Sequence, residues 1–150
     1  MDVAGRLQGT APVKLVLGLM LLGGEPVRAD TTTITVRTTS STLQFEPAAI
    51  SAKQGSRVRL RLVNEGTLPH NLVIVRDEAD IDLLADLASK AGGDYVPLAQ
   101  KAKLIAWTSL ASPGQTVEVV FVVPPPGEYP YVCFMSGHAM SMLGTLRSLR

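Results

Sequence analysis

Alternating apolar and polar residues are the clearest pattern along the chain. Residues 57–63 read RVRLRLV, in which every second side chain is apolar. Successive side chains of a β-strand point to opposite faces, so we expect Val58, Leu60 and Leu62 to face a core and the arginines to face water. Residues 31–39 (TTTITVRTT) interleave β-branched and polar residues in a similar way and predict a half-buried strand.

Further strand-like segments follow, separated by glycine and proline turn signals. The segments are 71–75, 104–108, 116–123, 129–133 and 142–146, and the turn signals lie at 53–55, 64–66, 112–114 and 124–127. About seven short strands without an internal repeat are typical of a Greek-key β-sandwich. The predicted fold class is therefore all-β.

One segment, between Asp77 and Ala91, has a different period. Apolar residues recur there at intervals of three and four (Ile81, Leu84, Leu87 and Ala88), acidic residues lie near the start, and Gly92-Gly93 follows the end. This pattern predicts one short amphipathic helix inserted between strands.

The first 29 residues have the layout of a secretory signal peptide. A weakly basic start precedes an apolar run at 15–22, and the small-residue site Val27-Arg28-Ala29 follows. The run is shorter than the roughly 20 residues that cross a bilayer, so cleavage after Ala29 is favoured over retention as an anchor. We expect residues 30–150 to form the mature domain, without a membrane span, in the periplasm or another extracytoplasmic compartment.

Charge and cysteine content restrict the function of this domain. At 150 residues and 46% hydrophobic, the chain has the size of one compact domain, which we expect to be a monomer. Residues 30–150 carry equal numbers of acidic and basic side chains and no basic run, which gives no electrostatic footprint for nucleic acid. Cys133 is the only cysteine, so an internal disulfide is excluded and the thiol needs another explanation.

The stretch CFMSGHAMSM, residues 133–142, brings together Cys133, His138 and Met142. A thiolate, two imidazoles and a weak thioether are the ligands of a type 1 copper site. The second imidazole is supplied by His70, which lies at the end of a strand that we expect to pair across the sandwich with the strand ending at Cys133. This set predicts one copper ion that cycles between Cu(I) and Cu(II).

The spacing of these residues resembles a known family. Cys133-x4-His138-x3-Met142 is similar to the ligand loop of azurin-type cupredoxins, which are related to auracyanins and plastocyanin, and Pro69-His70-Asn71 resembles the segment that supplies the first histidine. The resemblance implies a cupredoxin-like Greek-key sandwich in residues 30–150. It also implies that His70, Cys133 and His138 are strong ligands and Met142 a weak axial one. Asn71 would join the two ligand segments by hydrogen bonds near Cys133 and Phe134.

Other interpretations of the same residues are weaker. A lone buried cysteine is often a small hydrophobe. A cysteine–histidine pair can also be a nucleophile and its base, but Met142 would then be unexplained and no oxyanion loop is evident. A structural zinc site is disfavoured because zinc is bound by Cys, His, Asp and Glu and not by a thioether. A multicopper oxidase is disfavoured because such enzymes need more histidines than the two present. Met135 and Met140 compete with Met142 as thioether donors, and the spacing favours Met142.

The expected function is one-electron shuttling between a redox-protein donor and acceptor, with no enzymatic activity. Copper delivery or sequestration outside the cytoplasm is the alternative.

Overall fold

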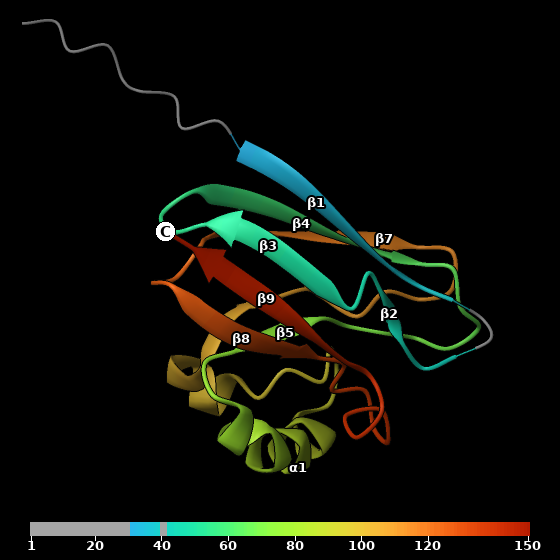
Figure 1. The fold of residues 1–150 in the computed structure, drawn as a ribbon. Coiled ribbons are helices and arrows are strands. Elements are labelled where there is room, and N and C mark those ends of the chain that lie inside the picture. Colours follow the sequence, from blue (N-terminus) through green and yellow to red (C-terminus); the bar gives the residue numbers. More distant parts are fainter. Residues whose placement is uncertain (1–30, 40–41) are drawn as a thin grey trace, which may run out of the picture.

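Two β-sheets form the body of the protein in the computed structural model, which describes residues 31–39 and 42–150 (Figure 1). The predicted signal peptide, residues 1–29, lies outside the described residues. The first sheet has the order β2 (Phe45–Glu46), β1 (Thr31–Thr38), β4 (Arg57–Asn64) and β7 (Thr116–Val122). The second sheet has the order β3 (Ala49–Lys53), β9 (Leu143–Leu149), β8 (Gly127–Val132), β5 (Val73–Val75) and β6 (Leu104–Trp107). The all-β sandwich is confirmed.

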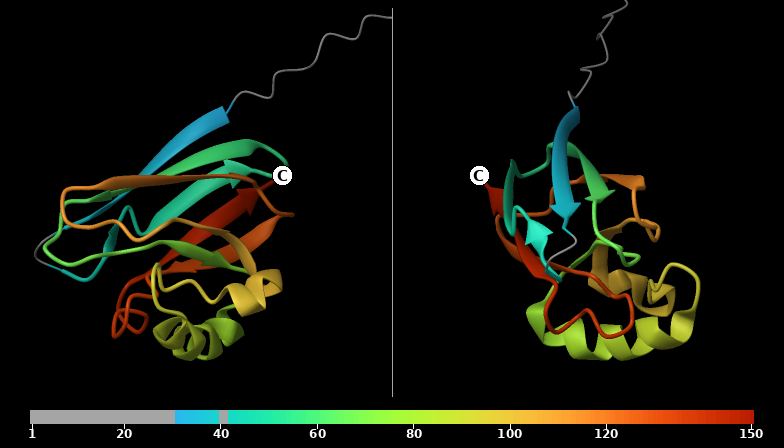
Figure 2. Two further views of the ribbon diagram at one scale, coloured as in Figure 1. Left: turned by 180° about the vertical axis from the view of Figure 1, so that it is seen from behind. Right: turned by 90° about the vertical axis from the view of Figure 1, so that its right-hand side faces the viewer.

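The predicted helical insertion is also confirmed. η1 (Glu78–Asp80) and α1 (Ile81–Ala91) lie within the predicted segment, whereas η2 (Leu98–Lys103) was not predicted; all three lie between β5 and β6 in the chain. Asp77 begins the insertion, because its Oδ1 accepts a hydrogen bond from the amide of Ala79 at 2.9 Å. The helices lie along the five-stranded sheet, on the side away from the first sheet (Figure 2).

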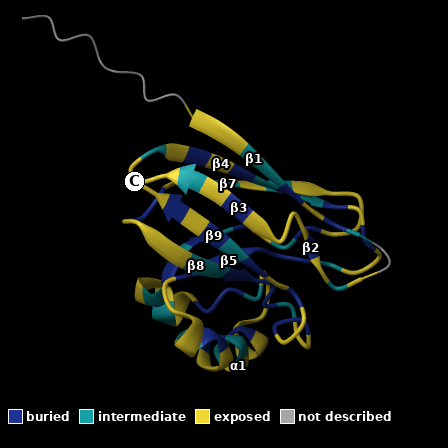
Figure 3. Cartoon of the chain, viewed as in Figure 1, coloured by how far each residue is buried: buried dark blue, intermediate teal, exposed yellow. Residues whose placement is uncertain are grey.

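The alternation in residues 57–63 has the predicted consequence. Val58, Leu60 and Leu62 are fully buried, whereas arginines on the opposite face lie in water, and Figure 3 shows this change of burial along β4. Arg59 and Arg61 donate to the carboxylate of Glu118 on β7 at 2.9 and 2.8 Å. These pairs are exposed and contribute little to stability.

Two strands were not predicted, and one is longer than predicted. β2 and β3 are short, and β3 buries only Ile50 fully, so the local sequence carries a weak period. β9 continues past residue 146 to Leu149 because Ser148 is buried there and its Oγ donates to the Pro124 carbonyl at 2.6 Å. A buried serine in a strand is not distinguishable by sequence pattern from an exposed one.

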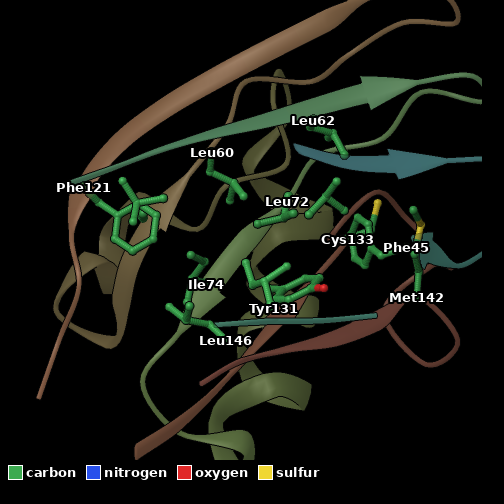
Figure 4. Packing of buried hydrophobic residues seen from close by; sticks show 14 of the residues in the cluster. Phe45, Leu60, Leu62, Leu72, Ile74, Phe121, Tyr131, Cys133, Met142 and Leu146 are labelled. Carbon is green, nitrogen blue, oxygen red and sulfur yellow. The ribbon is translucent and has the colours of Figure 1, made fainter. Parts of the chain in front are cut away.

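Buried side chains form two cores, one on each face of the five-stranded sheet. The inner core lies between the sheets (Figure 4) and includes Val36, Phe45, Leu60, Leu62, Leu72, Ile74, Tyr131, Cys133, Met142 and Leu146. The outer core lies under the helices and contains Val73, Val75, Ile81, Leu84, Ala88, Val96, Leu104, Val132, Phe134 and Ala139. The segment that follows β8 contributes to both cores.

Gly144 on β9 is a position where the inner core admits no side chain. It pairs with Tyr131 on β8, and a Cβ at residue 144 would lie 2.1 Å from Cζ of the tyrosine ring. Tyr131 cannot move away easily, because it is fully buried and its hydroxyl donates to the Pro47 carbonyl at 2.7 Å.

We therefore expect Gly144→Ala to lower the free energy of unfolding by about 1–3 kcal/mol, the usual cost of overpacking a core. Gly127→Ala is the matched control, since a Cβ there would lie 3.6 Å from the Tyr129 ring, an ordinary contact. Urea denaturation of the metal-free proteins would measure both. Equal stability of the two variants would contradict the expectation.

Candidate metal centre

The loop between β8 and β9 carries three of the four predicted donors, Cys133, His138 and Met142, in a fixed backbone conformation. Cys133 follows β8 directly, and its amide donates to the Met142 carbonyl at 3.1 Å. The carbonyl of His138 accepts from the amide of Met142 at 2.9 Å, and the His138 amide donates to the Met135 carbonyl at 2.9 Å. Gly137 adopts a φ of 83°, a left-handed conformation that glycine allows without strain. The loop thus turns His138 back toward Cys133.

His70 reaches the same place through sheet pairing. β5 and β8 are antiparallel neighbours with Val73 opposite Val132, so the residues before β5 run beside those after β8. The expectation that these strands pair across the sandwich is therefore wrong, because they lie side by side in one sheet. His70 is also held by an isolated bridge to Ala111, with backbone hydrogen bonds of 3.0 and 2.8 Å.

Three donor atoms converge at this end of the sandwich. The Cys133 Sγ lies 3.8 Å from Nδ1 of His70 and 3.6 Å from Nδ1 of His138. One donor atom from each residue lies within 4.8 Å of the other two, and all three residues are buried. No other group of His, Cys, Asp and Glu with this geometry occurs among the residues that the structure describes.

These distances fit a single metal ion. Metal bonds of about 2.0 Å to nitrogen and 2.3 Å to sulfur, set 120° apart, place the two donors about 3.7 Å from each other. The observed separations of 3.6 and 3.8 Å agree with that value. A thiolate and two imidazoles in this arrangement suit a soft or borderline ion, such as copper.

The three methionines of the loop have different surroundings. Met142 is fully buried in the inner core, and Figure 4 shows it at the same end of that core as Cys133. Met135 is partly buried against the inner core, whereas Met140 is 81% exposed. Burial beside the cysteine favours Met142 as the thioether donor of the three.

Burial controls the protonation of the site. Desolvation, together with a smaller effect of the neighbouring His138, lowers the pKa of His70 to about 4; burial also lowers the pKa of His138. Both rings are therefore neutral at pH 7, the form that can bind a metal. Desolvation raises the pKa of the Cys133 thiol to about 11, against the opposing effect of hydrogen bonds from the amides of Asn71 and Met135. A cation must therefore displace the thiol proton when it binds.

Asn71 joins the two ligand segments, as the resemblance implies. Its side chain is fully buried, and its Oδ1 accepts from the amide of Phe134 at 2.8 Å. The side-chain NH2 of Asn71 donates to the carbonyls of Asp94 and Tyr95, at 2.7 and 3.3 Å.

Sequence reasoning missed the polar residues that hold the loops around the site. Asn64 is fully buried, and its Nδ2 donates to the carbonyls of Leu68 and Ala111, both at 2.8 Å. Thr108 accepts from the amide of Leu72 through Oγ1 at 3.1 Å. An asparagine before Gly66 reads as a turn signal, so nothing in the sequence indicates that its side chain is buried and fully bonded.

No helix among the described residues is long and apolar enough to cross a membrane.

Comparison with known proteins gives a family match over most of the chain. The family described as copper-binding proteins, plastocyanin/azurin family, matches residues 32–147. The sequence is 33% identical over 119 residues to auracyanin-B of Chloroflexus aurantiacus, and 30% identical over 128 residues to the plastocyanin of a Synechococcus strain. The match covers 76% of this chain and 51% of auracyanin-B, so the chain spans about half the length of that relative. For the plastocyanin it covers 81% of each chain.

Solved structures show the same similarity. The structure of auracyanin A, a "blue" copper protein of Chloroflexus aurantiacus, superimposes with a TM-score of 0.76 at 31% identity, covering 80% of this chain and all of the other. The cupredoxin-like architecture that the resemblance implied is confirmed.

Proposed function

The chain belongs to the plastocyanin/azurin family of copper-binding proteins, and from this premise we propose that it carries single electrons between redox proteins through one type 1 copper ion. The observation that carries the proposal is the buried group of His70, Cys133 and His138, whose donor atoms lie within 4.8 Å of one another. When bound, copper supplies a one-electron couple between Cu(II) and Cu(I).

His70, Cys133 and His138 are the proposed strong ligands, and Met142 is the proposed weak axial one. The two sulfurs favour Cu(I), and the imidazoles accommodate Cu(II). The backbone hydrogen bonds of the loop, together with Asn71, hold these side chains in place, so the donors need little movement when the charge on the metal changes. We assign no substrate turnover to the chain.

The surface at the ligand loop supports docking by uncharged contact. Residues 133–142 contain no charged side chain, and Leu68, Met140 and Leu143 near the ligands in sequence are 45%, 81% and 42% exposed. We propose that donor and acceptor proteins approach this surface next to His138, which is itself 6% exposed. Such contacts give weak electrostatic steering and therefore a weak dependence of the association rate on salt.

We also propose that residues 1–29 are a cleaved signal peptide and that residues 30–150 act as a monomer outside the cytoplasm. The apolar run at 15–22 and the small residues before Asp30 support this. N-terminal sequencing of the exported protein should begin at Asp30.

Copper delivery or sequestration is the second candidate function, since a thioether and a thiolate also suit Cu(I) transport. The two functions differ in how firmly the reduced protein holds its metal. A carrier should retain Cu(I) during many rounds of reduction and oxidation and show fast electron self-exchange. Rapid loss of Cu(I) to an equimolar chelator, with slow self-exchange, would favour delivery. NMR line broadening in mixtures of the two oxidation states measures the exchange rate.

The first prediction of the copper proposal concerns Cys133. Stoichiometric Cu(II) should give the purified domain an intense visible absorption from thiolate-to-copper charge transfer, and Cys133→Ser should abolish it because serine offers no thiolate. Met140→Leu is the control, since that exposed methionine of the same loop should leave the band unchanged. An uncoloured wild-type protein at stoichiometric copper would reject the site.

The second prediction concerns Met142. Met142→Leu should keep the colour but raise the reduction potential by about 60 mV or more, a tenfold relative weakening of Cu(II) binding, because a weak donor is removed. Protein-film voltammetry would measure the potential, with Met140→Leu again as the control. A potential unchanged by Met142→Leu would show that this methionine is not a ligand.

A further inference from the structure

The turn that joins α1 to η2 contacts both backbone segments beside His70. Asn71, the residue after His70, donates from Nδ2 to the carbonyls of Asp94 and Tyr95. On the other side, the carboxylate Oδ1 of Asp94 accepts from the amide of Leu110 at 2.9 Å. Leu110 precedes Ala111, the backbone partner of His70. Asp94 therefore connects the segment that carries His70 with the segment that pairs with it.

The pairing between His70 and Ala111 is short, and few hydrogen bonds support it. It is an isolated bridge outside the named strands, and the nearest backbone hydrogen bond between the same two segments is that of the Thr108 amide to the Leu72 carbonyl, at 3.0 Å. Asn64 also donates from Nδ2 to the Ala111 carbonyl at 2.8 Å. In a regular sheet, neighbouring pairs keep the register of each other. Here the hydrogen bond from the Leu110 amide to Asp94 adds a restraint on the residue directly before Ala111.

The turn itself has a specific backbone conformation. Gly92, Gly93 and Tyr95 have φ values of 65°, 55° and 55°, and Tyr95 is the one non-glycine residue with a positive φ in the described part of the chain. A left-handed tyrosine persists only where its surroundings hold it. Tyr95 packs against the outer core, and its amide donates to the Gly92 carbonyl at 3.1 Å. The turn thus presents Asp94 in one orientation.

We propose that Asp94 is a positioning residue of the metal site: by accepting from Leu110 and from Asn71, it fixes the backbone that holds His70 opposite Cys133. This proposal rests on the proposed copper function. Asp94 does not contact the ligands, and its side chain is exposed, so its effect on the site is carried by these hydrogen bonds and not by its charge.

Two substitutions at residue 94 separate the hydrogen bond from the charge. Asp94→Ala removes both the acceptor and the carboxylate charge, whereas Asp94→Asn removes the charge but keeps an Oδ1 acceptor for Leu110. We expect Asp94→Ala to weaken Cu(II) binding by about tenfold, the lower end of the effect of losing an outer partner of a metal ligand. The copper hyperfine splitting in its EPR spectrum should change. Asp94→Asn should keep the wild-type spectrum and an affinity within about twofold.

Asp77→Ala is the matched control. Asp77 is another exposed aspartate of the same insertion whose Oδ1 accepts one backbone amide, that of Ala79, at the same distance of 2.9 Å. It lies at the start of the insertion, away from the turn that contacts Asn71. We expect it to leave both the affinity and the hyperfine splitting unchanged. Identical results for Asp94→Ala and Asp94→Asn, or for Asp94→Ala and Asp77→Ala, would overturn the proposal.

A measurement on the metal-free protein separates this proposal from the copper function. Amide hydrogen exchange at Ala111 and His70 should be about tenfold faster in Asp94→Ala than in Asp94→Asn, because one hydrogen bond next to the bridge is lost. Unchanged exchange would reject the positioning role even if copper binds. Conversely, an uncoloured wild-type protein with copper would reject the site, even if the exchange rates differ as expected.

Discussion

The antiparallel pairing of β5 with β8 is the interaction on which the site depends. Val73 opposite Val132 sets a register that continues beyond both strands, so that His70 and Asn71 run beside Cys133 and Phe134. A slip of one residue would turn each side chain to the other face of the sheet. Cys133 would then leave the inner core and lose its position between the two histidines. The register set by the buried valines on β5 and β8 therefore determines where the proposed ligands lie.

The ligand loop is anchored on both faces of the five-stranded sheet. Cys133 and Met142 belong to the inner core, whereas Phe134 and Ala139 pack with α1 in the outer core. The loop therefore contributes buried side chains to both hydrophobic cores. Movement of the loop in either direction would expose apolar surface, at a cost of about 25 cal/mol per Å². This double packing supplies the rigidity that a redox centre needs and gives the helical insertion a role in the site.

The ligand loop, residues 133–142, contains no charged side chain, and several charges elsewhere on the sandwich are paired. Arg59 and Arg61 share Glu118 on the outer face of the first sheet, and Arg147 on β9 pairs with Glu128 on β8 in the second sheet. The chain as a whole has a formal net charge of +1. Unpaired charges clustered near the loop would make the reduction potential of a buried metal depend on the ionic strength. Paired charges, and charges far from the metal, have little effect because they are screened by water. The potential is then set mainly by the ligands and their burial.

The sequence alone was sufficient for the parts of this structure that depend on residue type and period. The alternation in β4 predicted which of its side chains are buried, and three of the four apolar residues spaced at three and four in α1 are buried, whereas Leu87 is half-buried. Histidine and cysteine are rare in the chain, so the sequence grouped His70, Cys133 and His138 as candidate ligands of one metal ion. Residues that act through the backbone gave no such signal. Asp94, in the run GGDYV, reads as a turn aspartate; which amide it accepts from depends on how the insertion folds back over the sheet. Ser148 and Asn64 are buried polar residues for the same reason, since their partners are carbonyls and amides brought near by tertiary packing. Metal ligands are visible in a sequence because their chemistry is uncommon, whereas the groups that hold ligands in place use donors and acceptors that every residue has.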